Sequence, residues 1–178
     1  PDWFNVETKD GSTIEYGRTL DAEYVPGAQL TVANWLINKS YDQYGNQTTY
    51  HYRTVNDEVL LHKIEYQATE VIFHYASRTD KNKLYFGDVP FNEEHIITSI
   101  EIFTENRRVR KYEFEYSRDI QTLLNEVKEF GSDGSELNSL MFNYGAKVGG
   151  FIEQSVVRAD LTPSNGMSSN KIVWPGDY

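Results

Sequence analysis

Residues 59–66, VLLHKIEY, and residues 70–76, EVIFHYA, decide the fold class of this chain. Both runs are rich in β-branched and aromatic residues, and only three residues separate them. Such runs suit a pleated, half-buried surface and are typical of strands. We therefore expect the two runs to pair as an antiparallel hairpin.

The same pattern recurs along the chain, with turn signals between the runs. Three further hairpins are expected: residues 3–6 with 14–16 around Asp10-Gly11, residues 33–41 with 47–53 around 42–46, and residues 95–103 with 108–116 around 104–107. A turn at 131–135 leads into a last strand at 139–144. The sequence thus predicts an all-β fold, an antiparallel meander of hairpins that forms a curved or partly closed sheet.

Other stretches are less regular. Residues 24–29, with Pro26-Gly27, are expected to form a loop, and residues 77–92 a long polar connection. The apolar residues of 117–130 fall at helical spacing, so we expect a short helical turn followed by a strand there. The chain is divided into a β-rich region, 1–144, and a Gly-, Ser- and Asn-rich linker or extension, 145–178, toward a following repeat domain.

A weak repeat of the form apolar-x-Tyr runs through the predicted strands. It occurs as Ile64-Glu65-Tyr66, Phe73-His74-Tyr75, Phe114-Glu115-Tyr116 and Phe142-Asn143-Tyr144. Residues two apart in a strand share a face, so each triplet places two large side chains together. We interpret them as a core-facing stripe; a platform for stacking a ligand is the alternative. Six aromatic residues are expected on the buried face of one continuous sheet: Trp35, Phe73, Tyr75, Phe114, Phe142 and Tyr144.

Composition excludes several classes of function. Lys and Arg number 17 against 27 Asp and Glu, giving a net charge of −10, whereas nucleic-acid binding requires a basic footprint. There is no cysteine, which excludes disulfides and thiolate chemistry. No apolar run approaches the roughly 20 residues that cross a bilayer, so this segment is not expected to insert into a membrane. Because the sequence starts at Pro1, we expect a piece of a longer polypeptide.

Neither a metal site nor a cofactor site is expected. The four histidines, His51, His62, His74 and His95, form no HExxH pair and are expected to be solvated strand residues. Arg78 and Asp80 are expected to fix a turn. Asp42 and Asn46 have a calcium-like spacing but lack the distal Glu of an EF-hand, so a structural turn is favoured. We therefore expect no catalytic, cofactor-binding or metal-binding residue in this chain.

The order of several short motifs resembles a known family. The motifs are Trp35-Leu36, Asp42, Gly45-Asn46, Tyr50-His51-Tyr52, Ile64-Glu65-Tyr66, 71–75, Arg78-Thr79-Asp80, 110–116, 124–130, Asp133-Gly134 and Phe142-Asn143-Tyr144. Over about residues 1–144 the chain resembles the Salmonella virulence plasmid B protein family, which includes the B component of insecticidal toxin complexes and is related to Rhs and YD-repeat proteins. Residues 174–178, WPGDY, resemble the start of an FG-GAP or VCBS repeat, and no calcium site is transferred from that likeness.

The resemblance implies a non-catalytic scaffold or shell module of a large toxin-like virulence protein that is secreted or at the cell surface. Its partners would be other regions of the same polypeptide or a cognate toxin component. One family member carries an ADP-ribosyltransferase with a Glu-x-Glu motif, but Glu113 and Glu115 alternate with aromatic residues and are expected on the solvent face of a strand. The alternative function is a carbohydrate- or protein-binding adhesin module that uses exposed aromatic residues.

Overall fold

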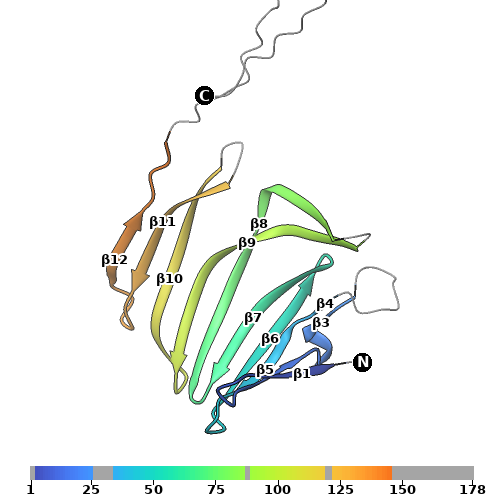
Figure 1. Cartoon of the computed structure of the whole chain (residues 1–178). Coiled ribbons are helices and arrows are strands. Elements are labelled where there is room, and N and C mark those ends of the chain that lie inside the picture. The colour runs from blue at the N-terminus through green and yellow to red at the C-terminus, as the bar shows by residue number, and fades with distance from the viewer. Residues whose placement is uncertain (1–2, 26–33, 87–88, 119–121, 146–178) are drawn as a thin grey trace, which may run out of the picture. The chain divides into compact units, whose positions relative to one another are not determined.

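The computed structural model describes residues 3–25, 34–86, 89–118 and 122–145. Ten strands form one antiparallel sheet in the order β1-β2-β5-β6-β7-β8-β9-β10-β11-β12, and β3 and β4 form a second, two-stranded ladder (Figure 1). The strands are β1 Phe4–Glu7, β2 Thr13–Tyr16, β3 Glu23–Tyr24, β4 Asn34–Trp35, β5 Ile37–Tyr41, β6 Gln47–Val55, β7 Glu58–Tyr66, β8 Thr69–Phe86, β9 Val89–Thr104, β10 Arg107–Arg118, β11 Thr122–Phe130 and β12 Glu136–Met141. A short 3-10 helix, η1, spans Leu20–Ala22.

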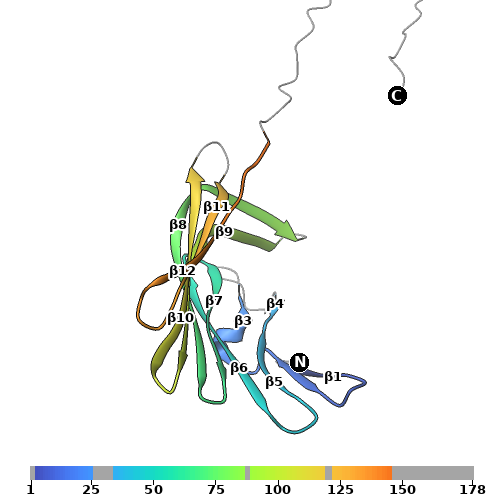
Figure 2. The same ribbon diagram turned by 90° about the vertical axis from the view of Figure 1, so that its left-hand side faces the viewer.

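The sheet is curved and open, which confirms the predicted fold class (Figure 2). All four predicted hairpins form: β1 pairs with β2, β5 with β6, β7 with β8, and β9 with β10. Gly11 and Gly45 lie in their turns at φ of 85° and 83°, a conformation that costs glycine little. Local turn chemistry therefore sets these hairpins, as the sequence indicates.

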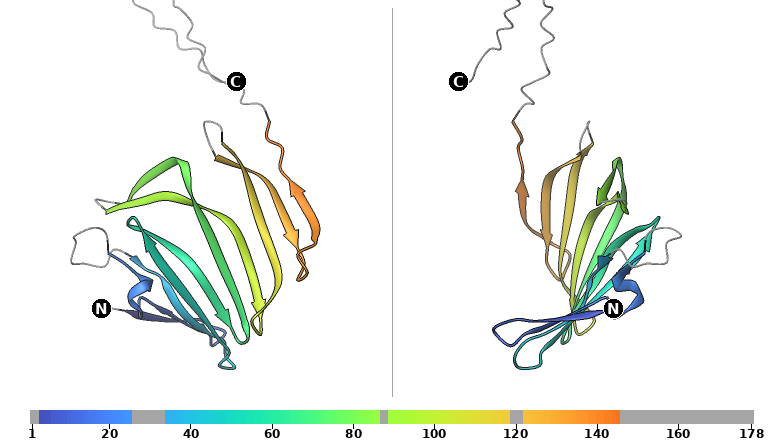
Figure 3. Two further views of the ribbon diagram at one scale, coloured as in Figure 1. Left: turned by 180° about the vertical axis from the view of Figure 1, so that it is seen from behind. Right: turned by 45° about the vertical axis from the view of Figure 1, so that its right-hand side comes forward.

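The prediction of a polar connection over residues 77–92 is wrong. Strand β8 continues to Phe86, and Asn82 to Phe86 pair with Val89 to Glu93 of β9. Only the stretch between Ser77 and Asn82 leaves the ladder, at a register shift. The polar residues there make side-chain contacts instead of forming a loop. The long hairpin bends at this point and extends away from the rest of β8 and β9 (Figure 3, left).

The prediction of a helical turn from Ser117 onward is also wrong for the residues that the structure describes. Ser117 and Arg118 end β10, residues 119–121 lie outside the described residues, and β11 follows. The helical spacing has a simple origin. Leu124 lies opposite Tyr116 and Val127 opposite Phe114, and an extra residue lies between them in β11. A bulge thus places residues three apart on one face of a strand.

Three smaller predictions fall near the edges of the described segments. The last strand ends at Met141, so residues 142–144 follow it instead of belonging to it. Of the loop predicted at 24–29, Tyr24 lies in β3 and residues 26–29 lie outside the described residues. The extension predicted over 145–178 stays a prediction, because all of it except Gly145 lies outside them too.

The described part of the chain has a small core. Its buried apolar residues are Ala22, Tyr24 and Leu60, at 0%, 5% and 6% exposure. The single buried face predicted for six aromatic residues is therefore wrong in part: Trp35 lies in the second ladder, and Tyr144 is 52% exposed. Phe73, Tyr75, Phe114 and Phe142 are half-buried. A domain normally buries its sheet against a second layer, and most of this sheet lacks one among the described residues.

Candidate functional site

Four β-bulges are the most regular feature of the sheet. In each, the register shifts directly before a tyrosine: Tyr16 in β2, Tyr52 in β6, Tyr75 in β8 and Tyr116 in β10. The partner strand contains one extra residue at that point, and it is polar every time: Asn38, His62, Thr98 and Asn125. A bulge bends its strand and increases the local twist. Bulges repeated in every second strand pair therefore curve the sheet.

Four tyrosine hydroxyls link neighbouring strands at these bulges. Each donates a hydrogen bond to the carbonyl directly before an extra residue: Tyr52 to Ile37 at 2.9 Å, Tyr75 to Leu61 at 2.7 Å, Tyr116 to Ile97 at 2.7 Å and Tyr144 to Leu124 at 2.8 Å. We call these four residues the tyrosine seam. Because a bulge interrupts the ladder, nearby backbone groups need other partners, and the phenols supply them.

The seam repeats by one rule. Each acceptor lies opposite the tyrosine of the preceding bulge: Ile37 opposite Tyr16, Leu61 opposite Tyr52, Ile97 opposite Tyr75 and Leu124 opposite Tyr116. The links therefore run without a gap from β2 to the segment after β12. Burial raises the pKa of Tyr52 to about 12 and also raises the pKa of Tyr75 and of Tyr116. These hydroxyls consequently remain protonated donors at neutral pH.

Three of the four seam tyrosines end apolar-x-Tyr triplets of the sequence. Phe73-His74-Tyr75, Phe114-Glu115-Tyr116 and Phe142-Asn143-Tyr144 each end on a seam tyrosine, but Ile64-Glu65-Tyr66 does not, because Tyr66 lies beside the β7–β8 turn and is 43% exposed. The missing member is Tyr52, in Tyr50-His51-Tyr52. A seam tyrosine can be distinguished from other strand tyrosines only when the strand pairing, and therefore the position of the bulges, is known.

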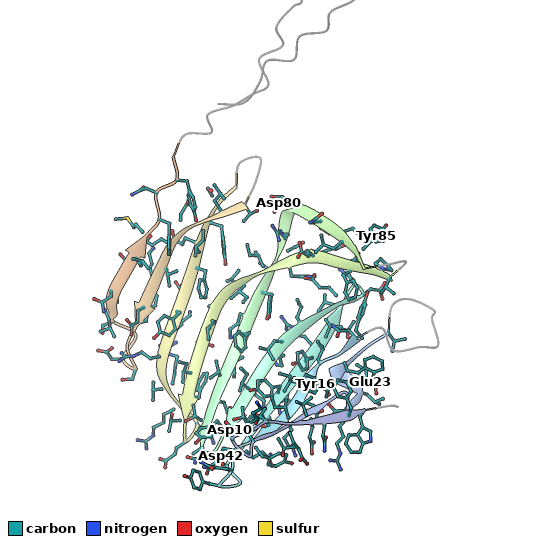
Figure 4. All side chains as sticks on the ribbon, in the orientation of Figure 1. Asp10, Tyr16, Glu23, Asp42, Asp80 and Tyr85 are labelled. Carbon is teal, nitrogen blue, oxygen red and sulfur yellow. The ribbon has the colours of Figure 1, made fainter. Side chains whose placement is uncertain are left out.

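The bent part of the β8–β9 hairpin, residues 78–93, is here called the arch. Asp80 holds one side of it, at the bend (Figure 4). Its carboxylate accepts bonds from Arg78 Nε and Nη2 at 3.0 and 3.1 Å, and from the Thr122 backbone N–H and Oγ1 at 2.8 and 2.5 Å. These bonds, those from Arg78 first, lower the pKa of Asp80. The predicted turn at Arg78 and Asp80 is wrong, because both residues lie in β8; Asp80 instead accepts a hydrogen bond from the backbone of Thr122 on β11.

The other side of the arch packs on the β6–β7 turn and β3. Glu58 accepts hydrogen bonds from the Glu94 backbone N–H at 2.9 Å and lies 2.7 Å from His95 Nδ1. The side chains of Glu58 and His95 are only 11% and 13% exposed. The Tyr24 hydroxyl donates to the Pro90 carbonyl at 2.7 Å, and its ring lies 5.0 Å from that of Phe91. The expectation that every histidine is solvated is therefore wrong for His95.

The register gives the two faces of the central sheet unlike character. On one face, Phe73 lies opposite Ile100, and Ile100 lies opposite Tyr112. Alternation adds neighbours to this apolar face, which consists of Val71, Phe73, Ile100, Ile102, Tyr112 and Phe114. All six are half-buried. A contiguous apolar surface of this kind is typical of a region that contacts another part of a protein.

The opposite face of the sheet, including β6 and β7, carries charged and histidine side chains that pair with one another. His51 pairs with Glu65 at 2.9 Å and His74 with Glu101 at 3.0 Å, and Glu101 also contacts Arg108 at 3.4 Å. Glu113 pairs with Lys111 at 2.6 Å and Glu115 with Lys128 at 2.5 Å, with both carboxylates 41% or more exposed. The predicted solvent face of β10 is thus confirmed. Each of these two carboxylates is paired with a lysine.

The remaining candidate residues, Asp42, Asn46 and His62, have structural positions in a turn and a bulge. The Asp42 carboxylate accepts the N–H groups of Tyr44 and Asn46, both at 2.8 Å, and the Asn46 side-chain amide at 2.6 Å, which lowers the pKa of Asp42. This is the predicted structural turn. His62 is a bulge residue whose pKa is lowered by burial, so it is neutral. Within the described ranges, no three His, Asp or Glu side chains gather in a way that could hold a metal ion.

The fold and seam define an open, curved antiparallel sheet whose aligned bulges produce its curvature and whose faces are largely uncovered. A family model described as Salmonella virulence plasmid 65kDa B protein matches residues 1–126. The chain belongs to that family. Among curated proteins, none matches the sequence.

Solved structures share the fold at low identity. The crystal structure of TcdB2-TccC3-Cdc42 matches with a TM-score of 0.71 at 15% identity, over 81% of this chain and 10% of that chain. The Photorhabdus luminescens Tc holotoxin pore matches with a TM-score of 0.72 at 15% identity, over 80% and 10%. The N-terminal domain of effector protein SpvB from Salmonella typhimurium strain LT2 matches with 0.67 at 14% identity, over 80% and 62%.

The chain therefore spans about a tenth of the two toxin-complex chains. Family membership confirms the resemblance to the virulence plasmid B family, and the structural likeness agrees with the expected relation to toxin complexes. The likeness of residues 174–178 to an FG-GAP or VCBS repeat stays a prediction. In the described segments, no helix is both long and apolar enough to span a bilayer.

Proposed function

We propose that this chain is a non-catalytic wall module of a large, secreted toxin-like protein. Its curved sheet forms part of a shell, and its contacts are with other regions of the same polypeptide or with a cognate toxin component. Family membership and the likeness to toxin-complex chains support this role. No cofactor, metal ion or nucleic acid takes part in it.

One observation carries the proposal: the repeated bulges curve the sheet, yet the sheet has only a small core of its own. Its apolar face, including Phe73, Ile100 and Phe114, is half-buried instead of packed. Burying apolar surface contributes roughly 25 cal/mol per Å², so a sheet with an uncovered apolar face gains stability when another layer covers it. A wall segment of a larger assembly obtains that layer from its neighbours.

The experiment compares the isolated chain with the longer polypeptide that contains it. Carbene footprinting of both should show Phe73, Tyr112 and Phe114 strongly labelled in the isolated chain and protected in the longer one. Tyr44, which is 81% exposed at a turn, is the internal control and should label equally in both. Equal labelling of the three apolar-face residues in both proteins would contradict the wall role.

A binding module that stacks carbohydrate on aromatic side chains is the second candidate function. The half-buried rings of Phe73, Tyr112 and Phe114 on one face are the observation that favours it. A glycan array probed with the isolated chain separates the two functions. Saturable binding that Tyr112→Ala abolishes, together with unchanged footprinting in the longer polypeptide, would favour the binding module.

A further inference from the structure

The two buried polar residues of the sheet lie side by side. Glu15 of β2 is 6% exposed and Asn38 of β5 is 2% exposed, and no other polar residue is buried in the part of the chain that the structure describes. The Asn38 amide donates to Glu15 Oε2 at 3.4 Å. Burying a carboxylate costs free energy unless other groups compensate it. In a sheet with so small a core, packing alone does not explain a buried carboxylate.

The bulge accounts for Asn38 but not for Glu15. Asn38 is the extra residue between β2 and β5, and its Oδ1 accepts the Arg18 backbone N–H at 3.0 Å. Glu15 accepts one bond of ordinary length, from Arg18 Nη1 at 2.8 Å, besides the long bond from Asn38. A carboxylate has about four acceptor positions. Among the described residues, Glu15 therefore has acceptor positions that no donor fills.

Both residues line a hollow of about 400 Å³, together with Arg18, Lys39, Tyr41 and Thr49. Lys39 lies opposite Thr49, and Thr49 lies opposite Glu65, so the hollow is on the face that carries the charged pairs. Small-molecule sites commonly have volumes of about 300–1,000 Å³. The hollow is therefore of a size that holds a small ligand.

Lys39 contributes a cation that has no anionic partner among the described residues. It lies directly opposite Glu15 in the β2–β5 ladder, so the two side chains share a face. The Lys39 ammonium lies 5.8 Å from the centroid of the Tyr41 ring instead of pairing with the carboxylate. His51 also lines the hollow, but it pairs with Glu65 at 2.9 Å. The hollow thus combines an unfilled acceptor with an unpaired cation.

We propose that this hollow binds a sugar that carries a carboxylate, such as a uronic acid. A hydroxyl group both donates and accepts, so sugar hydroxyls can donate to Glu15 while accepting from Asn38. A carboxylate on the same ring pairs with Lys39 in a charge-assisted hydrogen bond. Because Arg18 already pairs with Glu15, a ligand with one negative charge balances the charge of Lys39. The chain as a whole has a net charge of −10, so this attraction is local.

An acidic side chain from another part of the protein fits the hollow less well. Its carboxylate can pair with Lys39, but it has no donor for Glu15 and brings a second carboxylate near the first. The hollow lies on the face opposite to the apolar one, so this site differs from the aromatic rings of the alternative function. It also does not require the sheet to be a shell wall.

Titration of the full chain with methyl β-glucuronide, followed by ¹H–¹⁵N NMR, tests the proposal. Saturable shift changes are expected at the amides of Glu15, Arg18, Asn38 and Lys39, but not at Tyr112 on the apolar face. Methyl β-glucoside and sodium acetate should bind about tenfold more weakly, since the first lacks the carboxylate and the second lacks the hydroxyls.

Two variants separate the roles of the charged groups. Lys39→Met should weaken binding of the glucuronide about tenfold, because it removes the charged partner and keeps a side chain of similar length. Lys83→Met should leave binding unchanged and is the matched control, since the Lys83 ammonium also lies 5.8 Å from a tyrosine ring, that of Tyr85 in the arch. Glu15→Gln should reduce the preference for the glucuronide over acetate, because it removes the acceptor for the hydroxyls.

Several results would overturn the proposal. Acetate that binds as tightly as the glucuronide would make the hollow a simple anion site, and a glucoside that binds as tightly would remove the role of Lys39. Equal binding by the Lys39→Met and Lys83→Met variants would place the ligand elsewhere. Lys39 is half-buried, so its variant decides the question even where Glu15→Gln does not fold. The absence of saturable shifts around the hollow would leave no site.

Discussion

The corner formed by η1, β3, the start of β7 and the arch belongs to the same unit as the outer strand β12, but the two are stabilised in different ways. At the corner, Ala22, Tyr24 and Leu60 are at most 6% exposed, and the contact of Glu58 with His95 is largely buried. In β12 every residue is exposed. The difference shows that this sheet is packed where a second layer lies over it. Elsewhere it depends on backbone hydrogen bonds and the tyrosine seam.

The largest expected effect is at the corner. Tyr24→Ala removes a buried ring and its bond to Pro90, and should cost about 3–5 kcal/mol of unfolding free energy, as for other buried aromatic residues. Tyr144→Ala removes a half-exposed ring and one hydrogen bond and should cost about 1 kcal/mol. Urea unfolding followed by tryptophan fluorescence measures both. Equal losses would remove the contrast between the two regions.

The buried contact of Glu58 with His95 and Glu94 gives the next largest effect. Glu58→Ala leaves His95 and the Glu94 N–H without their acceptor, which should cost about 2–3 kcal/mol. Glu113→Ala removes an exposed partner of Lys111 on the face that carries the charged pairs and should change stability by less than about 0.5 kcal/mol. The ratio of the two losses, measured by urea unfolding, tests whether the charged groups of the corner are structural.

The pH dependence of stability at the arch tests whether the Asp80 carboxylate stabilises it. The pKa of its carboxyl is lowered in the folded protein from the ordinary value of 3.8 by bonds from Arg78 and Thr122. The unfolded chain therefore binds the proton more tightly, so the contribution of Asp80 to stability is complete above pH of about 4 and is lost as the pH falls through the lowered pKa. Hydrogen exchange of residues 82–86 should be faster in Asp80→Asn than in the wild type at pH 7, and the two should converge in acid.

A difference that persists undiminished at low pH would show that Asp80 acts through packing and not through its charge. Thr122→Val is the matched variant on β11, since it removes only the Oγ1 donor and leaves the backbone N–H. It should accelerate exchange of the same amides by a smaller factor than Asp80→Asn at neutral pH.

The seam should give smaller effects of similar size. Tyr75→Phe and Tyr116→Phe each remove one hydroxyl that bonds to a carbonyl, which should cost about 1 kcal/mol apiece and leave the ring in place. Tyr112→Phe is the control on the same strand as Tyr116. If the seam variants match that control in urea unfolding, the hydroxyl links do not stabilise the sheet.

The smallest effects are expected from the charged face. Glu115→Gln breaks an exposed pair with Lys128 and should change the unfolding free energy by less than about 0.5 kcal/mol. Phe114→Ala, next to it on the apolar face, should cost about 1–2 kcal/mol, because the ring is half-buried instead of fully buried. A larger loss for Glu115→Gln than for Phe114→Ala, by thermal unfolding, would reverse the assignment of the two faces.

The sequence predicts the hairpins because their turns are encoded locally, as at Asp10-Gly11 and Asp42 to Asn46. It fails where a residue's role depends on a distant strand. The spacing of Arg78 and Asp80 is typical of a turn, and only the folded structure shows that Thr122 of β11 bonds to Asp80. Leu124 and Val127 mimic a helix because Asn125 is a bulge residue. Trp35 alternates like a core strand residue but lies in a separate ladder. The apolar-x-Tyr triplets were recognised, but their carbonyl acceptors depend on the pairing.

The seam also bears on how such chains can diverge. The stretch between Tyr52 and Tyr75 contains two tight turns, whereas the stretch between Tyr75 and Tyr116 includes the whole arch, yet both end in the same kind of link. The link therefore does not require a fixed number of residues between its tyrosines, and we expect loops between seam residues to tolerate insertions and deletions while the sheet keeps its curvature. Homologues are then better aligned by tyrosines that face bulges than by any fixed period.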